Sequence, residues 1–137
     1  MADRTARFGI PAARLGIVYG VADSRNLIAL VGLANAKRIL FTAQRFDAGE
    51  AARIGFVDEV VDAALGEATR AFAATLAENA PLSIAGAKLI LNAVANGEVS
   101  ERRGAIEAAV ERSNESQDYR DGVQAFLEKR EPRFTGR

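Results

Sequence analysis

The stretch FDAGEAARIGFVDEVV, Phe46–Val61, is the most clearly patterned segment of this 137-residue sequence. Asp47 stands where a helix can begin, and Glu50 follows three residues later, the spacing of a capping box that satisfies the first free N–H groups of a helix. Gly55 stands at the other end, where glycine favours helix termination. The apolar run FVDEVV then predicts a strand. The segment therefore predicts a short helix followed directly by a short strand.

The chain before this segment is predicted to begin with a strand and a turn. Residues 8–18 are rich in Ile, Val and Leu and predict a strand broken at Pro11, after which Tyr19 and Gly20 turn the chain. A helix follows and ends at Gly32, and the stretch LANAKRILFTA predicts a second short helix. Two short strands thus lie on the N-terminal side, too few to form a stable sheet alone.

From Asp62 onward the sequence is predicted to be helical, because apolar residues recur every three or four positions and so share one helix face. Pro81 can open a helix since the first turn needs no proline N–H, Gly97 stops that helix, and Ser116 caps the last one. Several apolar stripes are too thin for a self-sufficient bundle. We therefore expect a homo-oligomer in which these stripes are covered.

Composition limits the classes of function. Apolar residues make up 49% and charged residues 26% of the sequence, as in an ordinary globular domain with a real core. The 18 basic residues balance 18 acidic ones, so no net field draws the chain to nucleic acid or to an anionic membrane. The apolar runs are too short to span a bilayer, and MADRTARFG is not a secretory signal. The expected location is the cytoplasm.

The sequence has no cysteine and no histidine. The missing cysteines exclude disulfides, a thiolate nucleophile and cysteine-type zinc sites, and the missing histidines exclude a Ser-His-Asp triad. Any catalysis within the chain would use carboxylates, Lys, Arg, hydroxyl groups or the backbone.

Four motifs, taken together and in this order, resemble the enoyl-CoA hydratase/isomerase (crotonase) superfamily. They are ARFGIPAARLGIVYG, AKRILFTAQRFDAGEAARIGFVDEVV, NAPLSIAGAKLILN and SQDYRDGVQAFLEKREPRFTGR. The resemblance covers essentially the whole chain but matches only the C-terminal half of that family. It implies an α/β crotonase-like spiral, of which this chain holds the mostly helical C-terminal half with two short strands.

On this resemblance, residues 1–61 form the end of the crotonase core and residues 62–137 form the helical trimerisation region. A trimer or hexamer is then the expected oligomer. Because Met1 lies within family-like sequence, we expect a truncated reading frame, an expressed fragment or a proteolytic remnant of a longer protein.

The resemblance also implies a chemistry. Crotonase-like enzymes bind an acyl-CoA thioester and stabilise an enolate-like oxyanion with two backbone N–H groups, which typical members draw from the absent half. Hydratases add two glutamates for general acid–base work. The second glutamate follows the proline of the opening motif, and here the residue after Pro11 is Ala12. A methyl group cannot move a proton, so no catalytic residue is predicted in this chain.

Residues around that position leave alternatives open. Ala12 either lines the pocket of a member with altered chemistry, such as isomerisation, decarboxylation or thioester hydrolysis, or only fills a strand. Tyr19 and Gly20 are predicted to line the substrate pocket, Tyr19 packing in the core with its hydroxyl at the rim and Gly20 allowing close backbone approach. Asp23 is either a displaced acid or, as we favour, a helix cap.

Phe126 and Lys129 lie in the AFLEK motif and match positions that, in the family, contact the adenine and phosphates of CoA, often across a subunit boundary. An apolar ring suits a flat base, and a flexible ammonium suits phosphate. The alternative is a core phenylalanine on an amphipathic helix and an exposed lysine that favours the helix dipole. Both residues are therefore predicted substrate-binding residues with a structural alternative.

Two acidic pairs, Glu98/Glu101 and Asp118/Asp121, fall at helical spacing. Without oxygen-rich loops around them we interpret both as solvated faces rather than metal sites. No metal and no cofactor beyond the CoA carried by the substrate is expected.

The sequence therefore predicts the C-terminal segment of an enoyl-CoA hydratase/isomerase-family protein that binds acyl-CoA thioesters and belongs to fatty acid metabolism. The parent reaction would be hydration or isomerisation of an enoyl-CoA, and the segment alone is expected to be inactive. The alternative is a non-catalytic helical module that assembles with its own copies. Binding of a CoA thioester distinguishes the two.

Overall fold

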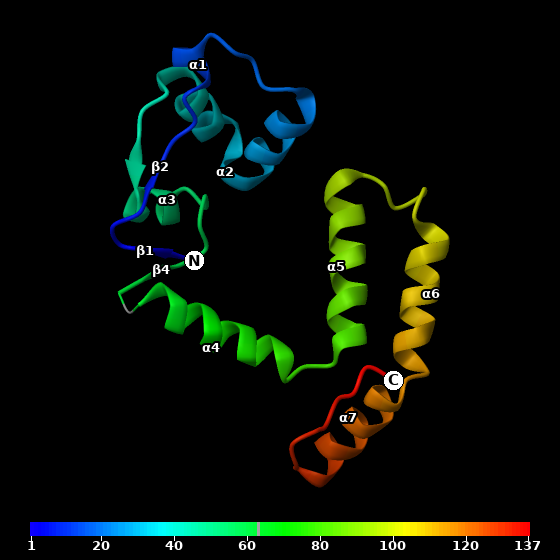
Figure 1. Cartoon of the computed structure of the whole chain (residues 1–137). Coiled ribbons are helices and arrows are strands. Elements are labelled where there is room, and N and C mark those ends of the chain that lie inside the picture. The colour runs from blue at the N-terminus through cyan, green and yellow to red at the C-terminus, as the bar shows by residue number, and fades with distance from the viewer. Residues whose placement is uncertain (63) are drawn as a thin grey trace. The chain divides into compact units, whose positions relative to one another are not determined.

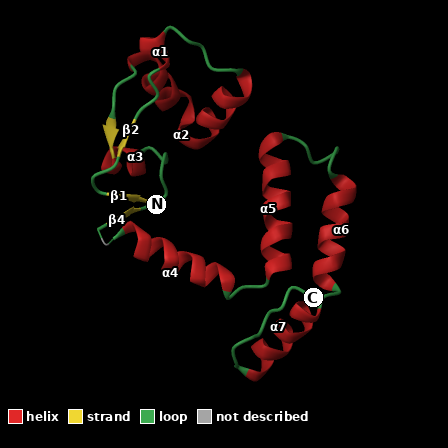
Figure 2. Cartoon of the chain, in the orientation of Figure 1, coloured by secondary structure: helices red, strands yellow, loops and turns green. Residues whose placement is uncertain are grey.

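A computed structural model describes residues 1–62 and 64–137 of the chain (Figure 1). The described chain divides into two compact units, residues 1–70 and 71–137. Their boundary falls inside helix α4 (Leu65–Ala77). The sequence suggested a boundary between residues 61 and 62, which divides the end of the core from the helical region. That boundary stays a prediction. Among the described residues, strands occur only in the first unit, and the second is helical (Figure 2).

Four strands of two residues each are found among the described residues of the first unit. β1 (Ala2–Asp3) pairs in parallel with β4 (Val60–Val61), and β2 (Arg7–Phe8) pairs antiparallel with β3 (Phe46–Asp47). The sequence predicted two longer strands instead. Of the run FVDEVV only the last two residues pair, and each sheet has two strands, an arrangement that is marginal without further packing.

The predicted strand over residues 8–18 is wrong beyond Phe8. Pro11 precedes the short helix α1 (Ala12–Leu15), and Gly16 ends it in the left-handed conformation at φ 66°. Ala, Arg and Leu are strong helix formers, so the sequence AARL after a proline adopts a helical turn. Ala12 therefore lies at the start of a helix and not in a strand.

Helix α2 (Val21–Thr42) begins earlier than predicted. Gly20 is its N-cap and no side chain caps it, so the cap predicted at Asp23 or Ser24 is wrong. Asp23 lies in the first helical turn, where a carboxylate favours the positive end of the helix dipole. Gly32, at φ 75° and ψ 161°, breaks α2 into two helical segments, as the sequence predicted.

For helix α3 (Ala48–Arg53) one of the two bonds of the predicted capping box is confirmed. Asp47 is the N-cap, and its carboxylate accepts the Glu50 backbone N–H at 2.8 Å. The Glu50 side chain does not complete the box. It binds the guanidinium of Arg53 at 2.6 Å and that of Arg38, and these hydrogen bonds, with Arg53 the larger contributor, lower the pKa of Glu50 to about 2.

Gly55 ends the α3 region as predicted. Its φ is +76°, and a Cβ there would stand 3.1 Å from the Leu30 carbonyl oxygen. Only glycine meets both demands without strain or displacement. This glycine therefore lets the chain turn from α3 toward β4 while running close to α2.

The core of the first unit lies between α2 and the end of α3. Its buried members are Leu27, Val31, Ala36, Ile39 and Ile54. Beside them Phe8, Phe46 and Phe56 form an aromatic cluster with ring centroids 5.4–6.0 Å apart. Aromatic contacts at this spacing add to the burial of apolar area. The segment quoted at the start of the sequence analysis thus supplies much of this packing.

The second unit consists of the end of α4 and three further helices in its described residues. These are α5 (Pro81–Asn96), α6 (Arg103–Asn114) and α7 (Gln117–Glu128). Pro81 stands in the first turn of α5 and Gly97 ends it at φ 73°, as predicted. The predicted helix from Asp62 onward begins at Leu65 instead, and Ala63 lies outside the described residues.

Helices α5 and α6 pack side by side (Figure 1), and Ala93 of α5 is fully buried. Much of the remaining apolar surface of the second unit is exposed, including Leu91 at 67% and Leu127 at 75%. This agrees with the thin stripes seen in the sequence. No helix in the described part of the chain is long and apolar enough to cross a membrane.

Candidate functional site

The C-terminal end of α7 presents an exposed aromatic ring. Phe126 is 83% exposed, so within the described chain it is not the core residue that the structural alternative required. The helix that carries it is well begun, because Ser116 Oγ accepts the Tyr119 backbone N–H at 3.0 Å and donates to the Ser113 carbonyl at 2.7 Å. The predicted cap at Ser116 is confirmed. Phe126 is available for contact with a flat apolar group.

Lys129 ends α7 in the left-handed conformation, at φ 55° and ψ 39°. Its backbone N–H donates to the Phe126 carbonyl at 3.4 Å, and the next N–H, that of Arg130, donates to the Ala125 carbonyl at 3.0 Å. These two bonds form a Schellman motif, whose left-handed position is usually glycine. A lysine holds this position at a cost of about 1 kcal/mol or more.

Lys129 lies next to a cluster of charged residues that pair with one another. The Arg130 guanidinium donates to Asp121 at 2.6 Å and to Glu128 at 2.8 Å. Hydrogen bonds from Arg130 and then from the Arg133 N–H lower the pKa of Asp121, while Gln124 and then Arg130 lower that of Glu128. In the described part of the chain Lys129 takes part in no ion pair. Its ammonium is thus free for an anionic ligand.

The C-terminal tail folds back on α7 and is held by carboxylates. Asp118 accepts the backbone N–H groups of Thr135 at 2.7 Å and Gly136 at 2.8 Å, and Asp121 accepts that of Arg133 at 2.7 Å. Asp118 is only 2% exposed. The interpretation of Asp118 as part of a solvated face is therefore wrong, because the tail covers it.

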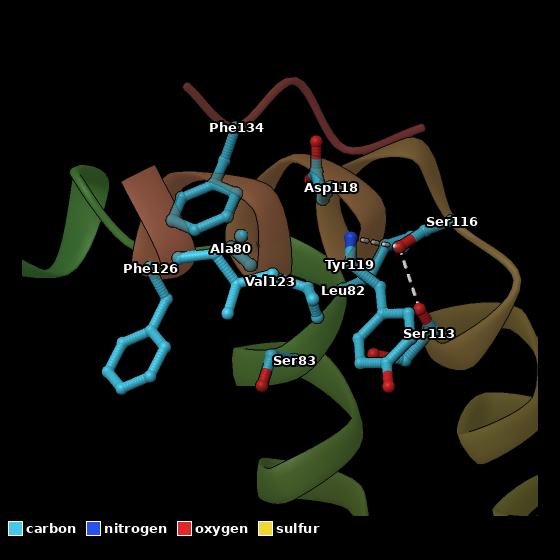
Figure 3. A pocket seen from close by; sticks show the side chains of 12 residues that line it. Ala80, Leu82, Ser83, Ser113, Ser116, Asp118, Tyr119, Val123, Phe126 and Phe134 are labelled. Carbon is cyan, nitrogen blue, oxygen red and sulfur yellow. Dashed lines mark hydrogen bonds between the residues drawn. The ribbon is translucent and has the colours of Figure 1, made fainter. Parts of the chain in front are cut away.

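A hollow of about 380 Å³ lies between the start of α5, the end of α6, α7 and the tail (Figure 3). Phe134 of the tail forms one wall, with its ring against Gly122, where a Cβ would stand 3.5 Å away. In Figure 3 Phe126 lies at one end of the hollow and Tyr119 at the other. Most of the surface is apolar and is lined by Leu82, Val123, Phe126, Leu127 and Phe134.

A second hollow, of about 240 Å³, lies in the first unit beside Ala12. Its lining includes Ile17, Val18, Leu40 and Phe41, and its polar side chains are the hydroxyl-bearing Tyr19 and Ser24. No carboxylate lines it among the described residues. Ala12 itself is 5% exposed. This wall can hold an apolar chain, but it offers no carboxylate to take or give a proton.

The other predicted residues of the first unit lie near this hollow. Tyr19 is 37% exposed in the loop before α2, so it is not the core residue that its predicted packing required. Gly20 has φ −67°, a conformation open to any residue, and serves as the N-cap of α2. Asp23 does not line the hollow. Its place in the first turn of α2 favours a role in stabilising the helix dipole over a catalytic role.

The structure brings Tyr19 and Ala12 together in the hollow of the first unit, which Gly20 does not line. In the second unit Phe126 and Lys129 lie at the end of α7. Glu98 of the remaining acidic pair binds Arg102 at 2.6 Å. Among residues 1–62 and 64–137 no group of three or more His, Cys, Asp or Glu side chains could hold a metal ion.

Sequence reasoning missed two features of the second unit. One is the hydrogen bonds that Asp118 accepts from the tail, and the other is the part of the hollow lined by Phe134. The Asp118 carboxylate and the N–H groups that it accepts lie 17 and 18 residues apart in sequence. Nothing in helical periodicity signals such a contact. Gly122, opposite Phe134, was the available hint, because a glycine inside a helix often marks a close approach by another group.

Comparisons with known proteins agree on one family. The family model described as enoyl-CoA hydratase/isomerase matches residues 1–137. A short-chain-enoyl-CoA hydratase of Clostridium acetobutylicum is 34% identical over 131 residues, covering 95% of this chain and 50% of that protein. A methylmalonyl-CoA decarboxylase of Escherichia coli is 33% identical over 142 residues, covering 99% of this chain and 53% of that protein.

Solved structures give the same result. The chain superposes on the enoyl-CoA hydratase from Bacillus anthracis with a TM-score of 0.86 and 29% identity, covering 98% of this chain and 53% of that one. This confirms the crotonase-like fold expected from the sequence. The chain spans about half the length of the relatives it matches. With its whole length matched by the family model and its fold shared with these structures, the chain belongs to the enoyl-CoA hydratase/isomerase family.

Proposed function

We propose that this chain is the acyl-CoA-binding, C-terminal part of an enoyl-CoA hydratase/isomerase-family protein, and that α7 supplies Phe126 and Lys129 to the CoA site. The observation that carries the proposal is the pairing, three residues apart, of a ring that is 83% exposed with an ammonium that takes part in no ion pair in the described chain. The ring suits adenine, and the ammonium suits a phosphate.

The longer protein would act on the thioester through an enolate stabilised by an oxyanion hole, with hydration or isomerisation of an enoyl-CoA as the family reaction. Oxyanion stabilisation needs fixed donors in a dry site. In this proposal those donors come from sequence outside the chain. The hollow beside Ala12 would form the apolar wall against the acyl group, with Tyr19 in its lining. Gly20, the next residue in the chain, would follow at the start of α2. The 137-residue chain alone would then bind CoA thioesters without turning them over.

Ala12 bears on the reaction class. Hydration needs a base for water, and the hollow beside Ala12 has no lining carboxylate among the described residues. Decarboxylation of a CoA thioester, the kind of activity named for the Escherichia coli relative, generates the enolate by loss of CO₂ and needs no base at this position. Ala12 therefore favours a reaction whose first step needs no proton abstraction by a residue that lines this hollow.

Calorimetric titration of the chain with acetoacetyl-CoA tests the binding proposal. We expect measurable binding that weakens about three- to tenfold in Lys129→Gln, as for loss of one solvent-exposed hydrogen bond of ordinary net strength. Lys88→Gln is the matched control, because Lys88 is an exposed lysine on α5 and should leave the affinity unchanged. Titration with pantetheine, which lacks the nucleotide phosphates, should show no difference between wild type and Lys129→Gln. No heat from a folded sample at high ligand concentration would overturn the proposal.

The second candidate is a non-catalytic helical module that assembles with its own copies. It is favoured by the exposed apolar residues of the second unit, among them Leu91, Val94 and Leu127 at 60–75%. A trimer or hexamer would cover such surface in either case, so oligomerisation alone does not separate the candidates. Concentration-dependent helicity without CoA binding, measured by circular dichroism and calorimetry on one sample, would favour assembly.

A further inference from the structure

Helices α1, α3, α5 and α7 end in one recurring backbone motif, and α7 is the one of these four whose left-handed residue is not glycine. Helix α2 ends differently, at the left-handed Ala43. Near the ends of α3 and α5 the N–H of the residue after a left-handed glycine donates to the carbonyl five residues back: Phe56 to Ala51 and Glu98 to Ala93. The left-handed residues are Gly55 and Gly97, at φ 76° and 73°. At α7 the same bond runs from Arg130 to Ala125, but the left-handed residue is Lys129.

A lysine in that position is strained, and such strain persists only where surrounding contacts enforce it. The surrounding contacts here are those of Arg130. Its guanidinium donates to Asp121, nine residues back on α7, at 2.6 Å and to Glu128 at 2.8 Å. Asp121 also accepts the Arg133 N–H of the tail at 2.7 Å. The residue that follows Lys129 is therefore anchored to the helix and, through Asp121, to the tail.

The same anchoring has an electrostatic effect. Asp121 and Glu128 are the carboxylates of α7 nearest to Lys129 that take part in ion pairs, and both pair with the single guanidinium of Arg130. A carboxylate left unpaired there could fold over the lysine and screen it. Arg130 therefore leaves the Lys129 ammonium as a cation without an intramolecular partner in the described chain, at the end of a helix whose carbonyl dipoles favour a cation.

We propose that the cluster Asp121–Arg130–Glu128 is a positioning device for Lys129: it fixes the left-handed turn and occupies the two acids of α7 nearest to Lys129, so that the ammonium can meet a phosphate of CoA. Asp121 and Arg130 are positioning residues and do not touch the ligand. The inference rests on the proposed function, since it concerns how the α7 residue of that site is prepared.

A double-mutant cycle on the full 137-residue chain tests this, with CoA as the titrant in calorimetry. Asp121→Asn should weaken CoA binding about two- to fivefold when Lys129 is present, as expected for partial loss of one charged contact. In the Lys129→Gln background the same substitution should have no further effect, because the group that Asp121 positions is gone. An equal loss in both backgrounds would mean a structural role only and would overturn the inference.

Glu98→Gln is the matched control. Glu98 also follows a left-handed residue and pairs with an arginine, Arg102 at 2.6 Å, but it flanks a glycine and not a lysine. We expect no change in CoA affinity. Arg130→Lys serves as a second variant if Asp121→Asn does not fold, and it should reproduce the dependence on Lys129. If Lys129→Gln itself leaves CoA affinity unchanged, the proposed function fails instead, so the two failures are distinguishable.

Discussion

Replacement of Lys129 separates the stability of the α7 terminus from its role in binding. Lys129 has φ 55°, so each non-glycine residue there carries left-handed strain that glycine avoids. Lys129→Gly and Lys129→Ala both remove the ammonium and its favourable term with the helix dipole. The difference between their free energies of unfolding therefore reports the cost of the left-handed backbone conformation.

We expect the free energy of unfolding of Lys129→Gly to be about 1 kcal/mol higher than that of Lys129→Ala. Alanine carries the penalty of the left-handed conformation, and the greater flexibility of glycine in the unfolded chain offsets part of that difference. Urea denaturation followed by circular dichroism measures it. Both variants should bind CoA more weakly than wild type. Lys129→Gly should thus be the more stable of the pair and no better a binder.

Lys88 provides the matched comparison, because it lies in the interior of α5. There the order reverses: Lys88→Gly should be about 0.5–1 kcal/mol less stable than Lys88→Ala, since glycine weakens a helix interior. CoA affinity should not change in either. If glycine proved the less stable choice at position 129 as well, the left-handed turn and the argument built on it would be refuted.

Three further changes test other contacts. Asp118→Ala leaves the N–H groups of Thr135 and Gly136 without their acceptor, so we expect a loss of about 1–3 kcal/mol and faster tryptic cleavage in the tail; unchanged cleavage would contradict the tail contacts. The pKa of Glu50 is lowered from 4.5 to about 2 in the folded chain, so its contribution to stability is complete above pH 4.5 and is lost as pH falls toward about 2. Glu50→Gln should therefore flatten the fall of the thermal midpoint over that pH range, and an unaltered slope would argue against the pairs with Arg53 and Arg38. Phe126→Ala should change stability by less than about 0.5 kcal/mol yet weaken CoA binding, whereas Phe46→Ala, in the aromatic cluster, should cost about 3 kcal/mol; a large loss at Phe126 would show that it packs in a core.

The features that the sequence predicted correctly are mainly local. The cap at Asp47, the end at Gly55, the start at Pro81, the end at Gly97 and the cap at Ser116 each depend on bonds within about five residues. Such bonds are encoded by residue type and spacing. The family motifs carried the rest of the fold, because isolated two-residue strands have no periodicity to detect.

The features that it missed depend on contacts distant in sequence or on competition between local options. The run of residues 8–18 had the composition of a strand, but Pro11 and the helix formers after it favoured α1. Asp23 is a residue type that caps helices, but the helix begins three residues earlier, with Gly20 as its N-cap. Asp118 is buried only because the tail returns to it.

The central claim is that the end of α7 binds CoA. Backbone amide chemical shifts of the isotopically labelled chain, recorded during titration with CoA, test it most directly. The account predicts saturable shift changes that concentrate at residues 123–130 and largely disappear in Lys129→Gln. Saturating CoA that leaves these amides unmoved, or that moves them equally in Lys129→Gln, would contradict it.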